Sequence, residues 1–416
     1  MLPPTWREEV RRVGEVQSRR ERATGLAPAV GGMLALAAAL GIGRFVYTPI
    51  LPAMAEALGL TKTEAGLIAS ANFAGYLAGA LLAALPRLPG GSRRAWFLAA
   101  LAASALTTAA MGWADATASF LLLRFVGGAA SAFVLVLGSA LVLDRLARAG
   151  LDRWGALHFA GVGLGIAASA ILVDALQAAG AGWRTLWLGS GAAAAVALPL
   201  AAALVRPEAS VGAQPTPSAA PRSAASLPAG LGALTLCHGL FGFGYVVTAT
   251  FIVAAVRSAP ALRTLEGEVW LVVGLAAVPS TAAWTWAAQL LGVLPAYALA
   301  CLLAAIGVAA GGVWETASGA LLAAVLLGGT FMGITALGFA AARAAALDDG
   351  RRASALMTAG FGLGQVVGPL VAGRLLDATG SFAPPSLLAA AALAGAAWIA
   401  ILAARRGDAT AWAGRR

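Results

Sequence analysis

The stretch GIGRFVYTPI at residues 41–50 decides the fold, because it returns as GFGYVVTATF at residues 242–251. The offset from 41 to 242 is 201 positions. Two further pairs keep nearly this offset and the same order: LRFVGGAASA at 123–132 with AVLLGGTFMG at 324–333, and GVGLGI at 161–166 with GFGLGQ at 360–365. Two parallel half-repeats in such apolar sequence are typical of membrane transporters whose site lies where the halves meet.

The composition excludes a soluble protein. Hydrophobic residues make up 60% of the chain, charged residues 11%, and the mean hydropathy is +0.84, whereas an ordinary soluble domain carries about 25% charged residues. The net charge of +10 does not indicate nucleic-acid binding, because the arginines lie in short loops between apolar segments. Cys237 and Cys301 lie in apolar runs, so we expect neither a disulfide framework nor a metal site.

Twelve apolar segments predict an all-α integral membrane protein, since each is near the roughly 20 residues that cross a bilayer as a helix. Their predicted limits are 27–50, 63–85, 95–113, 118–143, 156–176, 184–204, 229–256, 269–291, 294–313, 317–343, 354–377 and 385–404. A stretch rich in proline, alanine and serine, which cannot bury enough apolar surface to fold, divides them six and six. The predicted divisions are a tail at 1–26, a six-helix bundle at 27–204, a linker at 205–228, a second six-helix bundle at 229–404 and a tail at 405–416.

The arginines also predict the orientation. They gather in the two tails and in most connections that follow even-numbered segments, while the other side has chiefly Lys62, Arg184, Arg257 and Arg263. Since positive loops face the cytoplasm, we expect both termini there, in a multi-pass protein of the bacterial inner membrane. No cleavage pattern follows the first segment, so we expect a retained anchor rather than a signal peptide.

Arg44 is the sharpest candidate functional residue, because a charge inside an apolar segment is costly and usually faces a cavity or a partner. It lies 17 residues into the segment 27–50, about 25 Å along a helix, in the outer part of the membrane. It either binds or orients an anionic substrate, or it is a structural arginine that bonds backbone carbonyls or extends outward. Arg124, six residues into 118–143, is expected at a similar depth.

Three other ionisable residues are candidates for ion coupling. Asp174, near the outer end of its segment, could pair with Arg44 or Arg124 and carry a proton, or it could cap the helix in water. His238 and His158 could relay protons because histidine titrates near neutral pH. The alternative for each histidine is ordinary packing with one backbone hydrogen bond.

Neutral polar residues inside the segments complete the predicted site. Such groups orient a substrate in a mostly apolar cavity, although single ones more often join helices. Asn72 and Tyr76 share a helix face because they are one turn apart. The others are Tyr245, Thr248, Thr250, Thr330, Thr335 and Gln365. Glycines spaced by four predict close helix contacts at 75 and 79, at 161 and 165, and at 360, 364 and 368.

Several chemistries lack their sequence signatures. Lys62 is the only lysine and lies in no phosphate-binding loop, so we expect no ATP site and a transport driven by gradients. We find no histidine pair with metal spacing, no GxSxG turn and no paired carboxylates at a membrane face, so we expect no cofactor. A membrane-embedded enzyme or a sensor is the alternative from another class.

Five stretches together resemble the major facilitator superfamily, and more narrowly its YbfB/YjiJ branch. They are GIGRFVYTPILPAM from 41, SANFAGYLAGAL at 70–81, GFGYVVTATF at 242–251, GGTFMGITALGFAAAR at 328–343 and GLGQVVGPLVAGRLLDATGSF at 362–382. The resemblance covers about residues 27–404. It implies two six-helix bundles around a central cavity lined by helices 1, 4, 7 and 10, with rocker-switch alternating access. It also implies that helices 1 and 5 are neighbours, which favours the pairing of Arg44 with Asp174.

The resemblance also carries over to single residues, with one departure. Arg124, within LLLRFVGG, matches a helix 4 arginine often linked to proton coupling. The loop GALLAALPRLPGGSRR at 79–94 has Ala83 or Ala84 where the superfamily has an aspartate, and the matching loop near Gln289 has no charge. These loops normally form a cytoplasmic latch between the bundles, so a weak latch is expected here.

Together these features predict a secondary transporter of a small organic solute, acting as a monomer and coupled to protons. Two intramembrane arginines with one nearby acid favour an organic anion. Efflux of amphipathic drugs or metabolites is the alternative within the same class.

Overall fold

The computed structural model describes residues 26–85, 88, 91–206, 230–345 and 350–413. The predicted tail 1–26 and linker 205–228 therefore lie almost wholly outside the described residues. The described chain is helical without strands, and it has 12 helices long and apolar enough to span a membrane, which confirms the all-α prediction.

The helices follow one another closely along the chain. After a π-helical stretch, η1 (Ala37–Ile42), they are α2 (Tyr47–Leu58), α3 (Lys62–Ala83), α4 (Arg93–Ala110), α5 (Thr117–Arg148), α6 (Gly155–Ala178), α7 (Trp183–Leu204), α8 (Leu231–Ser258), α9 (Glu266–Leu291), α10 (Val293–Val313), α11 (Ala317–Ala345), α12 (Gly350–Thr379) and α13 (Ala383–Ala413). Short 3-10 turns η2 (Met111–Trp113), η3 (Asp152–Trp154) and η4 (Pro260–Leu265) precede α5, α6 and α9. The helix α13 continues through most of the predicted tail at 405–416.

The first membrane span is longer than predicted and is interrupted. It runs over Leu26–Leu58 and includes η1, a non-helical turn and α2. Pro49 does not end it, because this proline lies in the first turn of α2, where no helical N–H bond is lost. The span ends at Gly59, whose φ of 65° favours glycine. Arg44 is therefore near the middle of this longer span in sequence, and its depth in the membrane stays a prediction.

The two half-repeats fold alike. In the first half α3 packs on α5 and η1 packs on α6; in the second half α9 packs on α11 and α8 packs on α12. A Cβ on Gly128 would collide with the backbone carbonyl of Asn72, and one on Gly328 with that of Val273, 201 positions after Asn72. The predicted glycine contacts are confirmed, since those of α3 meet the α5 backbone, those of α6 meet the first span and those of α12 meet α8.

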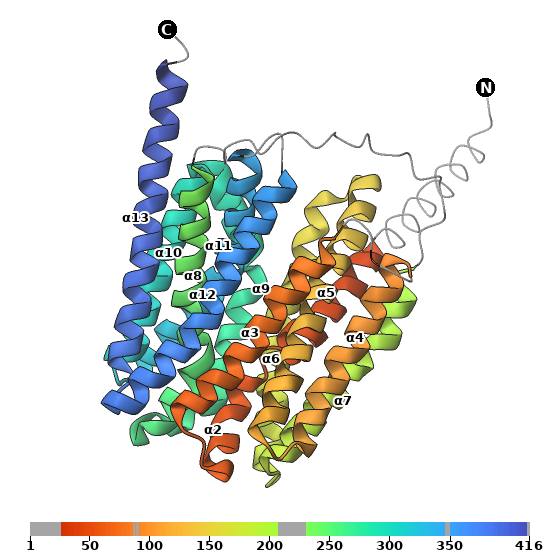
Figure 1. Cartoon of the computed structure of the whole chain (residues 1–416), viewed down its shortest axis with the longest axis vertical. Coiled ribbons are helices and arrows are strands. Elements are labelled where there is room, and N and C mark those ends of the chain that lie inside the picture. The colour runs from red at the N-terminus through yellow and green to blue at the C-terminus, as the bar shows by residue number, and fades with distance from the viewer. Residues whose placement is uncertain (1–25, 86–87, 89–90, 207–229, 346–349, 414–416) are drawn as a thin grey trace, which may run out of the picture.

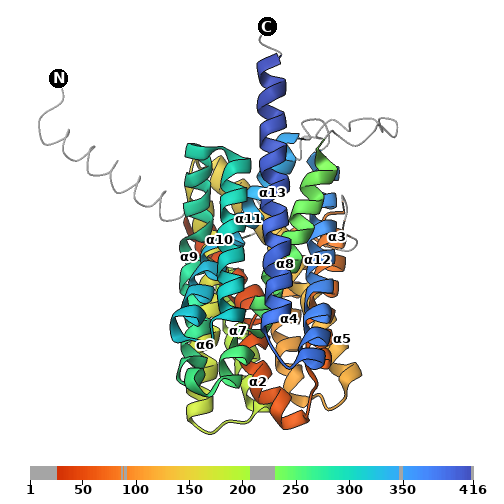
Figure 2. The same cartoon turned by 90° about the vertical axis from the view of Figure 1, so that its left-hand side faces the viewer.

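Figure 1 shows the two sets of helices side by side, with α3–α7 on the right and α8, α10, α12 and α13 on the left. The sets meet mainly through α3 against α12, α6 against α9 and α2 against α8. An even number of spans places Leu26 and the end of α13 on one face, which we call the termini face. Figure 2 shows α13 running from its loop after α12 to this face, and we call the opposite side the far face.

Candidate functional site

Arg44 lies in the turn between η1 and α2, and its side chain is buried among aromatic rings. Its guanidinium carbon is 4.0 Å from the ring centre of Tyr76, 4.8 Å from that of Phe73 and 5.3 Å from that of Phe45. The residue is only 4% exposed. Its Nε and one terminal nitrogen are buried without a hydrogen-bond partner, and no described ion pair includes it. Arg44 thus presents a charge and free N–H donors inside the protein.

Arg124 on α5 has a different role, because both of its terminal nitrogens bond the backbone of the first span, although its Nε is buried without a partner. Its two terminal nitrogens donate to the carbonyls of Gly43 and Arg44, at 3.1 and 2.9 Å. The interrupted helix leaves the Arg44 carbonyl available, since the Thr48 N–H bonds the Phe45 carbonyl instead. The predicted similar depth of the two arginines is confirmed. The alternative predicted for Arg44, a structural arginine that bonds backbone carbonyls, is therefore the role that Arg124 has in the structure.

Asn72 and Tyr76 place α3 against this turn. Tyr76 supplies the ring closest to the Arg44 guanidinium. The Asn72 side-chain amide donates to the carbonyl of Arg124 at 2.9 Å, so it joins α3 to α5, while its Oδ1 has no partner. Both residues are buried, and the predicted shared face is confirmed.

The second bundle contributes a stack of rings and an amide. The Gln365 side chain on α12 donates to the hydroxyl of Tyr245 on α8, and its Oε1 is buried without a partner. The Tyr245 ring lies nearly parallel to those of Phe331 and Phe361, with centres 5.8 and 5.9 Å away. Such a stack suits a flat or apolar group next to a polar one.

The two sets of residues meet through Phe45. Its ring centre is 6.0 Å from that of Phe331 on α11 and 6.5 Å from that of Trp270 on α9. Arg44 of the first bundle and Tyr245 of the second are therefore joined by a continuous row of aromatic contacts. Phe45, Phe73 and the stacked Phe331 and Phe361 were not predicted from the sequence, whose only signal was that Phe45 adjoins Arg44.

The predicted threonines differ in what their hydroxyls do. Thr330 and Thr335 donate to the carbonyls of Leu326 and Phe331 in their own helix, at 2.6 and 2.8 Å. Their hydroxyl protons are therefore not free for a substrate. The hydroxyl of Thr248 on α8 is buried and has no partner.

Of the predicted ion-coupling residues, Arg124 contacts the turn that carries Arg44, whereas Asp174, His238 and His158 do not. Asp174 is exposed near the end of α6 and faces Gly267 of α9, so the structure does not bring it to Arg44 or Arg124. His238 is buried between rings of the second bundle, 3.4 Å from the Tyr297 hydroxyl. His158 bonds Ser139 at 3.0 Å. Within the described residues no three His, Cys, Asp or Glu side chains form a metal-binding group.

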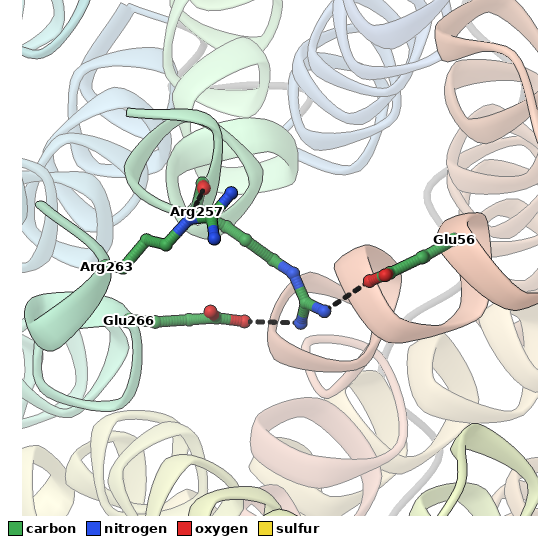
Figure 3. A network of polar contacts seen from close by, with 4 residues as sticks. All are labelled: Glu56, Arg257, Arg263 and Glu266. Atoms are coloured by element: carbon green, nitrogen blue, oxygen red, sulfur yellow. Dashed lines mark hydrogen bonds and ion pairs between the residues drawn. The ribbon is translucent and has the colours of Figure 1, made fainter. Parts of the chain in front are cut away.

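Equivalent positions of the two repeats are joined near the far face. Glu56 of α2 pairs with Arg257 of α8, 201 positions later, and the Thr48 hydroxyl donates to the Ala249 carbonyl at 2.6 Å, again at 201. Figure 3 shows Arg257 between Glu56 and Glu266, with Glu266 at 3.0 Å and in the same bundle as the arginine. We call the Glu56–Arg257 and Thr48–Ala249 contacts the far-face lock.

Other contacts close the same side. Asp377 at the end of α12 accepts from the N–H groups of Lys62 and Thr63, at 3.0 and 2.8 Å, and so caps α3 from the other bundle. A further hydrogen bond between the bundles in this half joins the Ser70 hydroxyl of α3 to the Val366 carbonyl of α12, at 2.7 Å. On the termini face, Arg94 donates to the carbonyls of Ala202 and Val205 within its own bundle.

Comparison with known families decides where the chain belongs. A family model described as "Uncharacterised MFS-type transporter YbfB" matches residues 36–401, where MFS stands for major facilitator superfamily. The chain is a member of this YbfB-type family. The predicted resemblance is therefore confirmed over most of the sequence. A search of curated proteins finds no match.

Solved structures share the fold of this YbfB-type chain. A point mutant of the nucleoside transporter NupG is 14% identical, with a TM-score of 0.68 over 91% of this chain and 99% of NupG. A bacterial homologue of the human lysosomal transporter Spinster, in an inward-facing and occupied conformation, is also 14% identical, with a TM-score of 0.65 over 92% of this chain and 97% of that one. At such identity the likeness establishes the MFS fold alone.

Proposed function

We propose that this YbfB-type protein is a secondary transporter of a small organic anion, bound between the bundles at Arg44. The observation that carries the proposal is the buried Arg44 guanidinium, which has unpartnered donors and no ion pair within the described residues. A carboxylate would accept two parallel N–H···O hydrogen bonds from the guanidinium and neutralise its charge.

The remaining contacts give the proposed substrate its shape. Rings of Tyr76 and Phe73 flank the guanidinium, and the stack of Tyr245 and Phe331 lies across the bundle interface. Free acceptors at Gln365 Oε1 and a free hydroxyl at Thr248 can bond a neutral polar group. These features support a compact anion with a flat or apolar body. Amphipathic efflux substrates remain the second candidate because the same rings would hold them.

The other predicted properties belong to the same proposal. The arginine-rich connections support termini in the cytoplasm of a bacterium. One chain holds both bundles and all proposed contacts, so we propose a monomer that moves its solute unchanged, without ATP and without catalysis. Proton coupling through Asp174, Arg124 or His238 stays a prediction, which transport measured with and without a pH gradient will test.

The test uses three ligands of one shape and different charge: benzoate, benzamide and benzamidinium. Uridine serves as a nucleoside probe because of the likeness to NupG. We expect benzoate alone to raise the thermal stability of the purified protein, since a ligand at a hundred times its dissociation constant adds about 2.7 kcal/mol. Arg44→Gln should abolish this rise, because removing one partner of a buried charge pair costs about 2–5 kcal/mol of binding.

Two variants serve as controls. Arg374→Gln removes one positive charge at an exposed position of α12, and it should bind benzoate like the wild type. Arg44→Lys keeps the charge but loses the paired hydrogen bonds of the guanidinium, and it should retain part of the affinity for benzoate. Equal stabilisation of wild type and Arg44→Gln by benzamidinium, with no effect of benzoate, would replace the anion proposal by amphipathic efflux.

A further inference from the structure

The charge at Arg44 has no described counter-charge that could neutralise it inside the membrane. The carboxylates whose side chains the structure describes all lie near helix ends and none is buried: Glu56, Glu64, Asp115, Asp144, Asp152, Asp174, Glu266, Glu268, Glu315 and Asp377. Glu56 is paired with Arg257, and Asp377 caps α3. Arg124 adds a second buried positive charge, bonded to the carbonyl of Arg44 itself.

The protein nevertheless buries Arg44 between its two bundles. The side chains around the guanidinium, Tyr76, Phe73 and Phe45, are each at most 8% exposed. Phe45 reaches across to Phe331 and Trp270 of the other bundle. The described arrangement therefore holds a positively charged group away from water.

The free energy of closing such a site differs between the protein with a bound anion and the protein without one. A guanidinium that leaves water loses its hydration, and aromatic rings return only part of it because they carry no net charge. A bound carboxylate enters with an opposite charge and uses the unpartnered donors of Arg44. The closed arrangement is therefore favoured with an anion and disfavoured without one. Every alternating-access cycle passes through a closed arrangement, in each direction.

We infer that this protein is an anion exchanger, which crosses its closed state with an organic anion bound and returns slowly when unloaded. The inference rests on the proposed function, and it adds that a second organic anion must be carried back on the return step. Arg44 imposes this requirement, since an arginine cannot release its proton to become neutral.

The test measures conformational switching by single-molecule fluorescence transfer in proteoliposomes, with dyes on the termini face of each bundle. Without added anion, we expect Arg44→Gln and Arg44→Met to switch at least tenfold faster than the wild type, equivalent to at least about 1.4 kcal/mol. Arg374→Gln, which removes an exposed charge, should switch at the wild-type rate. Benzoate should accelerate the wild type at least tenfold, whereas benzamide should not.

The outcomes separate the two claims. Equal switching rates of the wild type and both Arg44 variants in the absence of anion would overturn the exchange inference, whether or not benzoate binds to the protein. Failure of benzoate to stabilise the wild type counts against the proposed function, while the anion-free comparison still decides the inference. In a transport assay, the efflux rate of labelled benzoate from proteoliposomes, after subtraction of the protein-free leak, should rise at least tenfold when unlabelled benzoate is added outside. An efflux rate above the leak that does not depend on external benzoate would overturn the exchange inference.

Discussion

The two intramembrane arginines should respond in opposite ways when they are replaced. Arg124→Met removes both donors that hold the carbonyls of Gly43 and Arg44. Each buried carbonyl left without a partner costs about 1–3 kcal/mol. We therefore expect the free energy of unfolding to fall by about 2–6 kcal/mol, with weaker benzoate binding because the turn that carries Arg44 loses its support.

Arg44→Met should not destabilise the protein. The substitution leaves the backbone hydrogen bonds of the turn intact, because Arg124 bonds the carbonyl of Arg44 and not its side chain. It also removes a buried charge without a counter-charge, whose burial costs several kcal/mol of hydration, whereas each desolvated cation–π interaction contributes about 2 kcal/mol. We expect unfolding free energy within about 1 kcal/mol of the wild type, or above it, together with loss of benzoate binding.

The assay is reversible unfolding of the purified protein in mixed micelles, followed by tryptophan fluorescence. Arg374→Met, at an exposed position of α12, controls for the loss of one charge and should unfold like the wild type. If Arg44→Met is destabilised as much as Arg124→Met, then Arg44 is a structural residue and the separation of roles is wrong.

The lock and the repeat packing give two more predictions. Glu56→Gln breaks the ion pair between the bundles, whereas Glu266→Gln breaks one within a bundle. Since an exposed ion pair contributes up to about 1 kcal/mol, a cysteine introduced at Ala249 should react up to about fivefold faster with a maleimide added on the far side in the Glu56→Gln background only. Equal reaction rates in both backgrounds would refute the far-face lock. Gly128→Ala forces a Cβ onto a carbonyl of α3, so thermal unfolding should show a loss of about 1–3 kcal/mol. Gly329→Ala, 201 positions later, has open space and should cost nothing; equal costs contradict the packing.

The sequence was a sufficient guide to the spans and the repeat, because both depend on local properties. Hydropathy over some 20 residues marks each crossing, and the glycine pairs mark close helix contacts that the structure shows. The 201-residue offset also relates Glu56 to Arg257 and Thr48 to Ala249. The charge pair at these equivalent positions went unnoticed, since their contact depends on the bundles meeting near the far face.

The site was harder to predict because it depends on three-dimensional contacts. The first segment was predicted to end at residue 50, whereas the span continues through α2 to Leu58 and so places Arg44 near its middle in sequence. Which arginine bonds the backbone follows from the carbonyls freed at the interrupted helix. The pairing of Asp174 with an arginine was predicted from its place near the outer end of its segment and from helix adjacency, and the structure leaves that carboxylate exposed.

The most direct test of the central claim, that Arg44 binds the charge of its substrate, is a double comparison of affinities. Titration calorimetry would measure benzoate and benzamide, which differ chiefly in charge, against the wild type and Arg44→Gln. The account predicts that the wild type binds benzoate at least tenfold more tightly than benzamide, and that the variant loses this preference. A preference that survives in Arg44→Gln, or a wild type that binds both equally, would contradict it.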